Sequence, residues 1–535
     1  MNNQLPWLKM YDTGVPAHLV FPEMPVFGFL ENSTHLYSQK DALVEGEQHI
    51  SYGTLLERSK QLALRLVEWG LQPEDRVGLC LPNSIDFVIS YYAILMAGGV
   101  VAAINPSYPL REMDFQVGIS KPTFFIGSNK NIEIFLQLHT KYQFKKLILT
   151  GMTEELGKTG ALTFLVDFNN QVAGATGSLP KVNRNDPAVL QFSGGTTGLP
   201  KAAVGLHKNI VANVIQFSTW LTPLKHGVEK FLTVIPLFHV YGMVIGLNVG
   251  IAMGATIILL PDPRNIELIM QTASRERVTC FPGVPSIYHA INQAYSTINP
   301  PVDLTSIKAC ISGSAPLPLK TKKDFEKISG GRLVEGYGLS EAPTATHCNP
   351  IQNQDRPGSI GLPLPDVECR IVSIEDSNTD MEVNTQGELL IRGPQIMSGY
   401  FEQEEESKLT LKGGWLHTGD IARMDEDGFF YIAGRKKEMI KVGGLQVWPV
   451  EVENVINLVP GIRECAVTGE PDDEFGERVK LWAVLEKSAH VDLQTIRDFC
   501  QDKLGGYKIP RELQILNALP RSTVGKVLKY KLGRD

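Results

Sequence analysis

Residues 193–201 combine glycines, hydroxyl groups and one lysine in a pattern that could hold a chain of phosphates. The segment reads Ser193-Gly194-Gly195-Thr196-Thr197-Gly198-Leu199-Pro200-Lys201. Glycines let backbone N–H groups approach an anion, neighbouring N–H groups of a turn form an anion nest, and the lysine adds positive charge. Leu199 and Pro200 separate Gly198 from the lysine, so the spacing differs from that of a Walker A loop. The pattern predicts a polyphosphate-binding loop, although a tight turn would explain the glycines alone.

Seven further short motifs with glycines or charged residues follow this loop along the chain. They are Pro236–Gly242, Ser312–Pro316, Gly336–Glu341, Gly387–Leu389, Trp415–Asp420, Arg435–Lys437 and Gly525–Lys526. In content and order, the eight motifs resemble those of the adenylate-forming superfamily of acyl-CoA synthetases, luciferases and peptide-synthetase adenylation domains. The resemblance covers nearly the whole chain. It implies an acid–thiol ligase that uses ATP to convert a carboxylate to an acyl-adenylate, and then transfers the acyl group to a thiol.

The resemblance also implies roles for individual residues at the nucleotide. Thr196, Thr197 and Lys201 would hold the β- and γ-phosphates, and Tyr337 would stack on adenine. Mg²⁺ is the implied cofactor, with Thr196 and Glu341 as its ligands, because a hard cation favours oxygen donors. Asp420 would accept hydrogen bonds from the ribose with help from Arg435. The full set of implied nucleotide-binding residues is Ser193, Gly194, Gly195, Thr196, Thr197, Gly198, Lys201, Gly313, Ser314, Ala315, Glu335, Gly336, Tyr337, Asp420, Ile432 and Arg435.

Three residues are implied to act directly in catalysis. Lys526, near the C-terminus, would bridge the substrate carboxylate and the α-phosphate, although a lone lysine there is ordinarily a solvated charge. Ser340 would offer its hydroxyl to the α-phosphate. His239 lies in an apolar run where a histidine is often a core residue; the motif match favours a role at the acyl pocket or the carboxylate. No histidine pair has metal-binding spacing.

The resemblance implies two domains that change orientation between the half-reactions. An N-terminal domain over 1–435 would hold the nucleotide and acyl sites, and a mobile domain over 436–535 would carry Lys526. Lys437 matches the hinge position, although it could be only part of a basic surface run. Lys441, Gly443 and Gly444 match the loop on the CoA side.

The acid is less well defined than the chemistry. The variant loop Ser193–Gly198 resembles that of bacterial medium- and long-chain fatty acyl-CoA ligases, as do four other motifs: Glu335–Glu341, Gly414–Ile421, Arg435–Ile440 and Gly506–Pro510. Two departures, Ala202-Ala203 and Trp448, affect the expected substrate fit and remove no group that the chemistry needs. The alternatives are an aryl-acid CoA ligase of the coumarate or benzoate type, an acyl-AMP ligase that loads a carrier protein, and a non-catalytic nucleotide-binding regulator. The residues expected at the acyl pocket are Val240, Gly242, Val284 and Gly338.

Hydrophobic periodicity predicts which elements position these motifs. Strand-like and helix-like segments alternate, which favours an α/β fold with sheets flanked by helices and a small α+β unit at the C-terminus. A helix is expected over 54–69, with a capping box at Thr54 and Glu57. Strands are expected over 77–81, 255–260 and 278–281, and helices over 265–275 and from Pro449 onward.

Composition narrows the class of protein. The 535 residues are too many for one core, and 43% hydrophobic with 20% charged residues is ordinary for a globular chain. A net charge of -7 argues against a nucleic-acid binder, and the scattered cysteines favour a cytoplasmic location. The uncharged stretches 87–104 and 231–260 are interrupted by glycine or proline, so we interpret them as buried strands and helices. Transient peripheral contact with a membrane would suit a fatty-acid substrate, and the oligomeric state is not encoded in any pattern.

Overall fold

The computed structural model describes residues 5–151, 165–168, 174–193, 201–522 and 526–533. The chain divides into two compact units. Of the described residues, those within 5–193, 201–368 and 392–416 form the large unit, and those within 369–391 and 417–533 form the small unit. The small unit thus includes segments that precede residue 435. The domain boundary expected after that residue stays a prediction.

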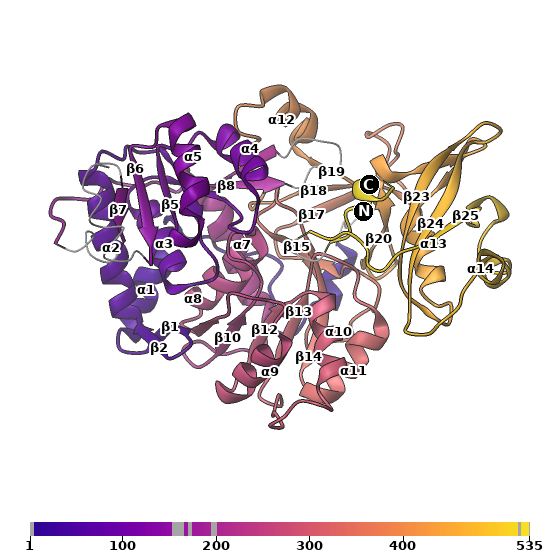
Figure 1. The fold of residues 1–535 in the computed structure, drawn as a ribbon, viewed down its shortest axis with the longest axis horizontal. Coiled ribbons are helices and arrows are strands. Elements are labelled where there is room, and N and C mark those ends of the chain that lie inside the picture. The colour runs from indigo at the N-terminus through magenta and orange to yellow at the C-terminus, as the bar shows by residue number, and fades with distance from the viewer. Residues whose placement is uncertain (1–4, 152–164, 169–173, 194–200, 523–525, 534–535) are drawn as a thin grey trace. The chain divides into compact units, whose positions relative to one another are not determined.

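A mixed sheet of nine strands, counted over the described residues, forms one half of the large unit (Figure 1). Helices α9 (Ile266–Arg275), α10 (Pro285–Ala294) and α11 (Leu319–Ser329) lie beside its β12–β14 part. Strands β1 and β10–β14 run parallel, so their carboxyl ends share one edge of the sheet. In order across the sheet the strands are β16 (Leu362–Pro363), β15 (Ala345–Cys348), β14 (Arg332–Gly338), β13 (Ala309–Ser312), β12 (Cys280–Gly283), β10 (Lys230–Thr233), β11 (Thr256–Leu259), β1 (Asp41–Glu45) and β2 (Gln48–Ser51).

A second sheet of the large unit has seven strands among the described residues. Its strands β3–β6 and β8 run parallel, while β8 and β9 are antiparallel and place Ser193 opposite Lys201. The lysine of the first motif therefore begins a strand at the edge of this sheet. The order is β7 (Leu165–Asp167), β6 (Lys146–Thr150), β5 (Phe124–Ser128), β3 (Arg76–Cys80), β4 (Val100–Ala103), β8 (Pro187–Ser193) and β9 (Lys201–Leu206).

Asn83, a buried side chain just after β3, connects the two sheets. Its Nδ2 donates to the carbonyl oxygens of Thr233, Ile235 and Leu260 at 3.1–3.2 Å. Its Oδ1 accepts the backbone N–H of Leu237 at 2.7 Å. One buried amide therefore satisfies four backbone groups and fixes the start of the segment that carries His239.

The small unit contains two antiparallel-rich sheets. One has the strand order β17 (Glu368–Val372), β18 (Gly387–Arg392), β19 (Leu416–Met424) and β20 (Phe430–Arg435). The other, β22 (Leu445–Val447), β21 (Ile440–Val442), β24 (Gly476–Leu485) and β23 (Ile462–Asp472), also pairs β25 (Glu512–Ile515) with β24. Helices α13 (Pro449–Ile456) and α14 (Leu493–Cys500) cover it with a core that includes Val452, Ile456 and Ile496.

The predicted α/β class is confirmed, as are most of the predicted elements. Helix α9 begins after Asn265, whose side chain accepts the N–H of Leu268, and α13 begins at Pro449 as expected. The predicted capping box at Thr54 is wrong. Helix α2 runs Tyr52–Glu68, and Ser51 is its cap, because the Ser51 hydroxyl accepts the N–H of Thr54.

The two uncharged stretches form buried elements, as predicted. Residues 87–104 lie in α3 (Ile85–Met96) and β4, and residues 231–260 form β10, the π-helix η3 (Gly242–Val249), the short α8 (Gly250–Ala252) and β11. Within the described parts of the chain, every helix is too short or too polar to cross a membrane.

Candidate active site

The carboxyl ends of β12, β13 and β14 bring two predicted motifs, Ser312–Pro316 and Gly336–Glu341, and Val284 to one sheet edge. Gly283 is paired with Ser312, and Ser312 with Glu335, so these residues are neighbours across the sheet. Loops that leave the carboxyl ends of parallel strands are the usual place for ligands in open α/β sheets. Residues 313–315 follow β13 directly, and residues 335–337 lie in the neighbouring strand β14.

The 236–242 motif is fixed against this same edge by Tyr241. Its buried hydroxyl donates to the carbonyl oxygen of Ile311 at 2.8 Å and lies 3.2 Å from that of Gly283. A Cβ atom on Gly313 would lie only 3.2 Å from the Tyr241 ring. The predicted acyl-side motif and the predicted adenine loop are thus in contact.

His239 is a neutral imidazole in this environment. Its Nδ1 accepts the backbone N–H of Tyr241 at 3.2 Å, which assigns the proton of the neutral ring to Nε2. Burial lowers the pKa of His239 to about 4. At neutral pH the side chain therefore offers an N–H donor without a positive charge, and part of its surface stays accessible.

Two of the glycines expected at the acyl pocket are required by close backbone approach. A Cβ atom on Gly242 would lie 2.3 Å from the carbonyl oxygen of Pro236, and one on Gly338 would lie 1.6 Å from that of Thr344. Both positions therefore exclude any side chain, whatever the substrate. Val240 and Val284 are buried, and their contact with an acyl chain stays a prediction.

Ser314 and Ala315 follow β13 in a constrained turn. Ser314 has a φ of 70°, in the left-handed region that favours glycine, and such backbone conformations concentrate at functional sites. On the next strand, Tyr337 meets His347 edge-to-face with 5.8 Å between ring centroids. Gly336 and Tyr337 are partly buried, and the stacking of Tyr337 on adenine stays a prediction.

Glu335 is a buried carboxyl group at the end of the parallel part of β14. Its Oε2 accepts the N–H of Leu317 at 3.2 Å. Burial raises the pKa of Glu335 to about 8, and this single hydrogen bond only partly offsets the shift. The group is therefore mostly protonated at neutral pH.

Glu341 and Lys201 belong to a charged cluster that the sequence did not predict. The hydroxyl of Tyr400 donates to Glu341 Oε1 at 2.8 Å. The Lys201 ammonium lies 5.1 Å from the Tyr400 ring centroid and forms an ion pair with Glu406. A partly buried carboxylate provides the oxygen donors that Mg²⁺ prefers, so Glu341 fits the expected metal role. Ser340, beside it, is also partly buried.

In the small unit, Asp420, Arg435 and Lys526 lie in one electrostatic cluster. Arg435 Nε lies 2.7 Å from Asp420 Oδ1, and the Asp420 side chain is buried. Burial lowers the pKa of Lys526, and the charge of Arg435 lowers it further, while Asp420 and Glu438 oppose these effects. The structure thus brings together three residues that lie far apart in the chain. Ile432 lies on β20, opposite Ala422 of β19.

The expected hinge and CoA-side loop are adjoining parts of the small unit. Lys437 lies in a short 3-10 helix, Lys436–Glu438, and Lys436 Nζ pairs with buried Glu388 at 2.8 Å. Gly443 and Gly444, with φ of 58° and 82°, form the two-residue turn between β21 and β22. Positive φ at both turn positions is the geometry that favours glycine in a tight hairpin. The N–H of Lys441 donates to Glu477 at 2.7 Å.

Five predicted phosphate-loop residues lie outside the described residues, and their roles stay predictions. They are Gly194, Gly195, Thr196, Thr197 and Gly198. Conversely, the sequence analysis missed Tyr400 and Glu406. The only local signal of a special residue here was the Gly399-Tyr400 pair. Local patterns could not predict the contacts of Tyr400 and Glu406, because these contacts join residues far apart in the chain.

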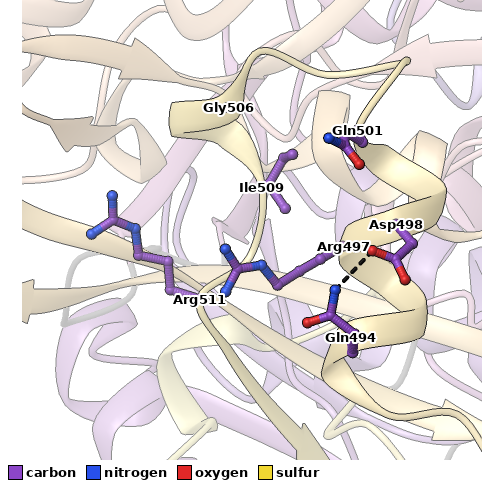
Figure 2. Close-up of a pocket in the computed structure, with 7 residues that line it drawn as sticks. All are labelled: Gln494, Arg497, Asp498, Gln501, Gly506, Ile509 and Arg511. Carbon is purple, nitrogen blue, oxygen red and sulfur yellow. Dashed lines mark hydrogen bonds between the residues drawn. The ribbon is translucent and has the colours of Figure 1, made fainter.

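A hollow of about 620 Å³ lies in the small unit (Figure 2). Arg497 of α14 and Arg511 are among its lining residues, and Gln494 donates to Asp498 beside them. None of the predicted site residues lines it.

Comparison with known proteins defines the class. Residues 30–401 match the family described as AMP-binding enzyme, and residues 451–526 match the AMP-binding enzyme C-terminal domain. The chain therefore belongs to the family of AMP-binding enzymes. The resemblance drawn from the eight motifs is confirmed.

The relatives are similar over almost their entire length. A long-chain-fatty-acid–CoA ligase of Bacillus subtilis (strain 168) is 37% identical over 558 residues, covering 99% of this chain and 98% of that protein. The crystal structure of the anthranilate CoA ligase AuaEII with anthranoyl-AMP superposes with a TM-score of 0.86 at 25% identity, covering 96% and 97%. ATP-bound MatB from Rhodopseudomonas palustris gives 0.84 at 26% identity, covering 95% and 98%.

The protonated state of Glu335 leads to a prediction about pH and stability. The pKa of Glu335 in the folded protein, about 8, lies above the ordinary value of a glutamate. The contribution of this group to the free energy of unfolding is therefore fully present at low pH. It is lost as the pH rises from about 4.5 toward 8, because the unfolded chain releases the proton more readily. We expect the melting temperature of Glu335→Gln, relative to that of the unsubstituted protein, to increase between pH 5 and pH 8.

The measurement is thermal unfolding at several pH values, with Glu47→Gln as a control at an exposed position. The control should show a constant difference from the unsubstituted protein. A constant difference for Glu335→Gln as well would mean that Glu335 is ionised at neutral pH.

Proposed function

We propose that this protein is an ATP-dependent fatty acid–CoA ligase acting on long-chain acids. The observation that carries the proposal is the full-length similarity to a bacterial long-chain-fatty-acid–CoA ligase, together with the complete set of motif residues. The Asp420–Arg435–Lys526 cluster supports it, because a ligase of this kind needs cations beside a developing phosphate charge.

The reaction has two steps because a carboxylate is a poor electrophile. In the first, a carboxylate oxygen attacks the α-phosphorus of ATP, a P–O bond forms, and pyrophosphate leaves. In the second, the CoA sulfur attacks the acyl carbon and AMP leaves with the bonding electron pair. The protein contributes mainly position and electrostatic stabilisation.

Lys526 is the proposed catalytic residue of the first step. A carboxylate and a phosphate are both anions and repel each other. The partly buried ammonium of Lys526 would offset this repulsion. Asp420 and Arg435 would hold the ribose, and the ion pair between them keeps the acceptor oxygens of Asp420 oriented. Ser340 would add a hydroxyl donor to the α-phosphate.

Glu341 and Thr196 would hold Mg²⁺, which when bound offsets negative charge on the phosphates. Lys201 would contribute a second positive charge to the same phosphates. The nucleotide set on the large unit, Gly313, Ser314, Ala315, Gly336 and Tyr337, would enclose the adenine.

His239 would act on the acyl side of the site. Because its ring is neutral and carries its proton on Nε2, it can donate a hydrogen bond to the carboxylate without forming a strong ion pair. Such a donor orients the carboxylate and does not bind the acyl-adenylate too tightly for the second step. Val240, Gly242, Val284 and Gly338 would border the acyl chain.

Lys437 would be the hinge between the two half-reactions, and the loop of Lys441, Gly443 and Gly444 would border the path of CoA. The backbone freedom of the two glycines suits a loop that must lie close to a narrow thiol arm. A cytoplasmic location with transient membrane contact is part of the same proposal, because long-chain acids partition into lipid.

The aryl-acid alternative has one observation in its favour. The anthranilate CoA ligase has a very similar fold, so this architecture accommodates an aromatic acid in that protein. The greater identity to the fatty-acid ligase favours a straight-chain acid here. A carrier protein as acceptor is a further alternative.

The proposed substrate class is tested by acid-dependent AMP release with Mg-ATP and CoA. The panel is acetate, hexanoate, laurate, palmitate, benzoate and coumarate. We expect the highest kcat/KM with laurate or palmitate. A maximum with an aryl acid would contradict the substrate assignment, and AMP release that ignores CoA would favour a carrier-protein acceptor.

Lys526→Ala tests the proposed catalytic residue by separating the half-reactions. We expect formation of acyl-adenylate to fall by about a hundredfold or more, as for loss of one group that stabilises a transition state. Transfer from a synthetic acyl-adenylate to CoA should change little, because that step does not need the lysine. The measurement is rapid-quench analysis of each step, with exposed Lys487→Ala as the control. Equal losses in both steps would contradict the role.

A further inference from the structure

Tyr400 contacts two residues of the proposed nucleotide site and belongs to none of the eight motifs. Its hydroxyl donates to Glu341 Oε1 at 2.8 Å. The face of its ring lies 5.1 Å from the Lys201 ammonium, within the range of a cation–π contact. One side chain thus joins the carboxylate expected to hold the metal and the lysine expected to hold phosphates.

The backbone around Tyr400 is fastened to strand β9. Tyr400 forms an antiparallel bridge with Ala203, and the N–H of Phe401 donates to the carbonyl oxygen of Ala202 at 2.8 Å. The N–H of Tyr400 itself donates to Ser407 Oγ at 2.8 Å. Because β9 begins at Lys201, the ring is held next to the strand that carries the lysine.

Glu341 is held at both ends by this same segment. Its carbonyl oxygen accepts the N–H of Met397 at 2.9 Å, and its carboxylate accepts the hydroxyl of Tyr400. The hydroxyl donates to one carboxylate oxygen, and among the described residues Oε2 has no hydrogen-bond partner. A carboxylate with one oxygen fixed in this way has fewer orientations to lose when a cation binds.

Lys201 is restrained from two directions. Its ammonium pairs with Glu406 of helix α12 (Glu404–Thr410) and lies over the Tyr400 ring. Ser407, one residue beyond Glu406, is the acceptor for the Tyr400 N–H, so the ring and the carboxylate belong to one connected arrangement. An unrestrained lysine would lose more side-chain entropy on binding a phosphate.

We propose that Tyr400 is a positioning residue of the nucleotide site, whose hydroxyl orients Glu341 toward a divalent cation and whose ring holds the Lys201 ammonium in place. This inference rests on the proposed function, because it takes Glu341 as a metal ligand and Lys201 as a phosphate ligand. It predicts that the two ends of one side chain have separable effects.

Tyr400→Phe removes the hydroxyl and keeps the ring. We expect it to weaken binding of ATP in the presence of Mg²⁺ by about tenfold, the effect of one hydrogen bond to a charged group. Binding of ATP in excess EDTA should change by less than about twofold, since the ring remains under Lys201. Both affinities are measured by calorimetry, which requires no turnover. Tyr400→Leu, which removes the ring as well, should weaken binding under both conditions.

Tyr142→Phe is the matched control. The Tyr142 hydroxyl also donates to a carboxylate, Asp114 Oδ1, at 3.0 Å, on the surface of the same unit. It should leave both ATP affinities unchanged. Thermal unfolding of each variant shows that a lost affinity does not come from a lost fold.

A double-substitution cycle with Glu341→Ala makes the coupling explicit. If the hydroxyl acts through Glu341, then Tyr400→Phe should have no further effect on Mg-dependent binding once Glu341 is removed. Equal losses from Tyr400→Phe in both backgrounds, or equal losses with and without Mg²⁺, would overturn the inference. An unsubstituted protein that fails to bind Mg-ATP would instead contradict the proposed function.

Discussion

A partly buried cation needs a counter-charge, and this requirement organises the candidate site. The reaction proposed here brings a carboxylate and a triphosphate together, and these two anions repel each other. The protein must therefore hold several cationic side chains where the substrates bind. In each unit these cations are already partnered within the protein. Lys201 is paired with Glu406, and Arg435 with Asp420, while Lys526 lies in the field of Asp420 and Glu438.

The same electrostatic principle sets the protonation state of two uncharged groups of the large unit. Burial of the ionisable groups lowers the pKa of the half-buried His239 and raises that of the buried Glu335, because it disfavours their charged forms. The imidazole is therefore a neutral donor, and the carboxyl group keeps its proton. The parallel sheet makes this arrangement feasible, because the ends of β12, β13 and β14 and the hydroxyl of Tyr241 fix these groups through backbone contacts.

Local patterns in the sequence were sufficient for the class of fold and for the residues with recognisable spacing. The helix starting at Pro449 and the strands close to 77–81, 255–260 and 278–281 follow from periodicity and turn chemistry. The helix cap was assigned wrongly at Thr54 because two hydroxyl residues, Ser51 and Thr54, precede the same apolar run. Tyr400 could not be found in this way, since its contacts with Lys201 and Glu341 depend on how β9 pairs with a distant segment. The burial that protonates Glu335 is likewise a product of the folded sheet.

The central claim is that an acyl-adenylate forms before any thiol takes part. Exchange of labelled pyrophosphate into ATP tests it most directly, measured with palmitate and Mg²⁺ and with CoA omitted. The account predicts exchange that requires the acid and proceeds without CoA. The reason is that formation of the acyl-adenylate is reversible and does not need the thiol. Exchange that requires CoA would contradict the account. So would a lack of exchange in a preparation that still makes palmitoyl-CoA.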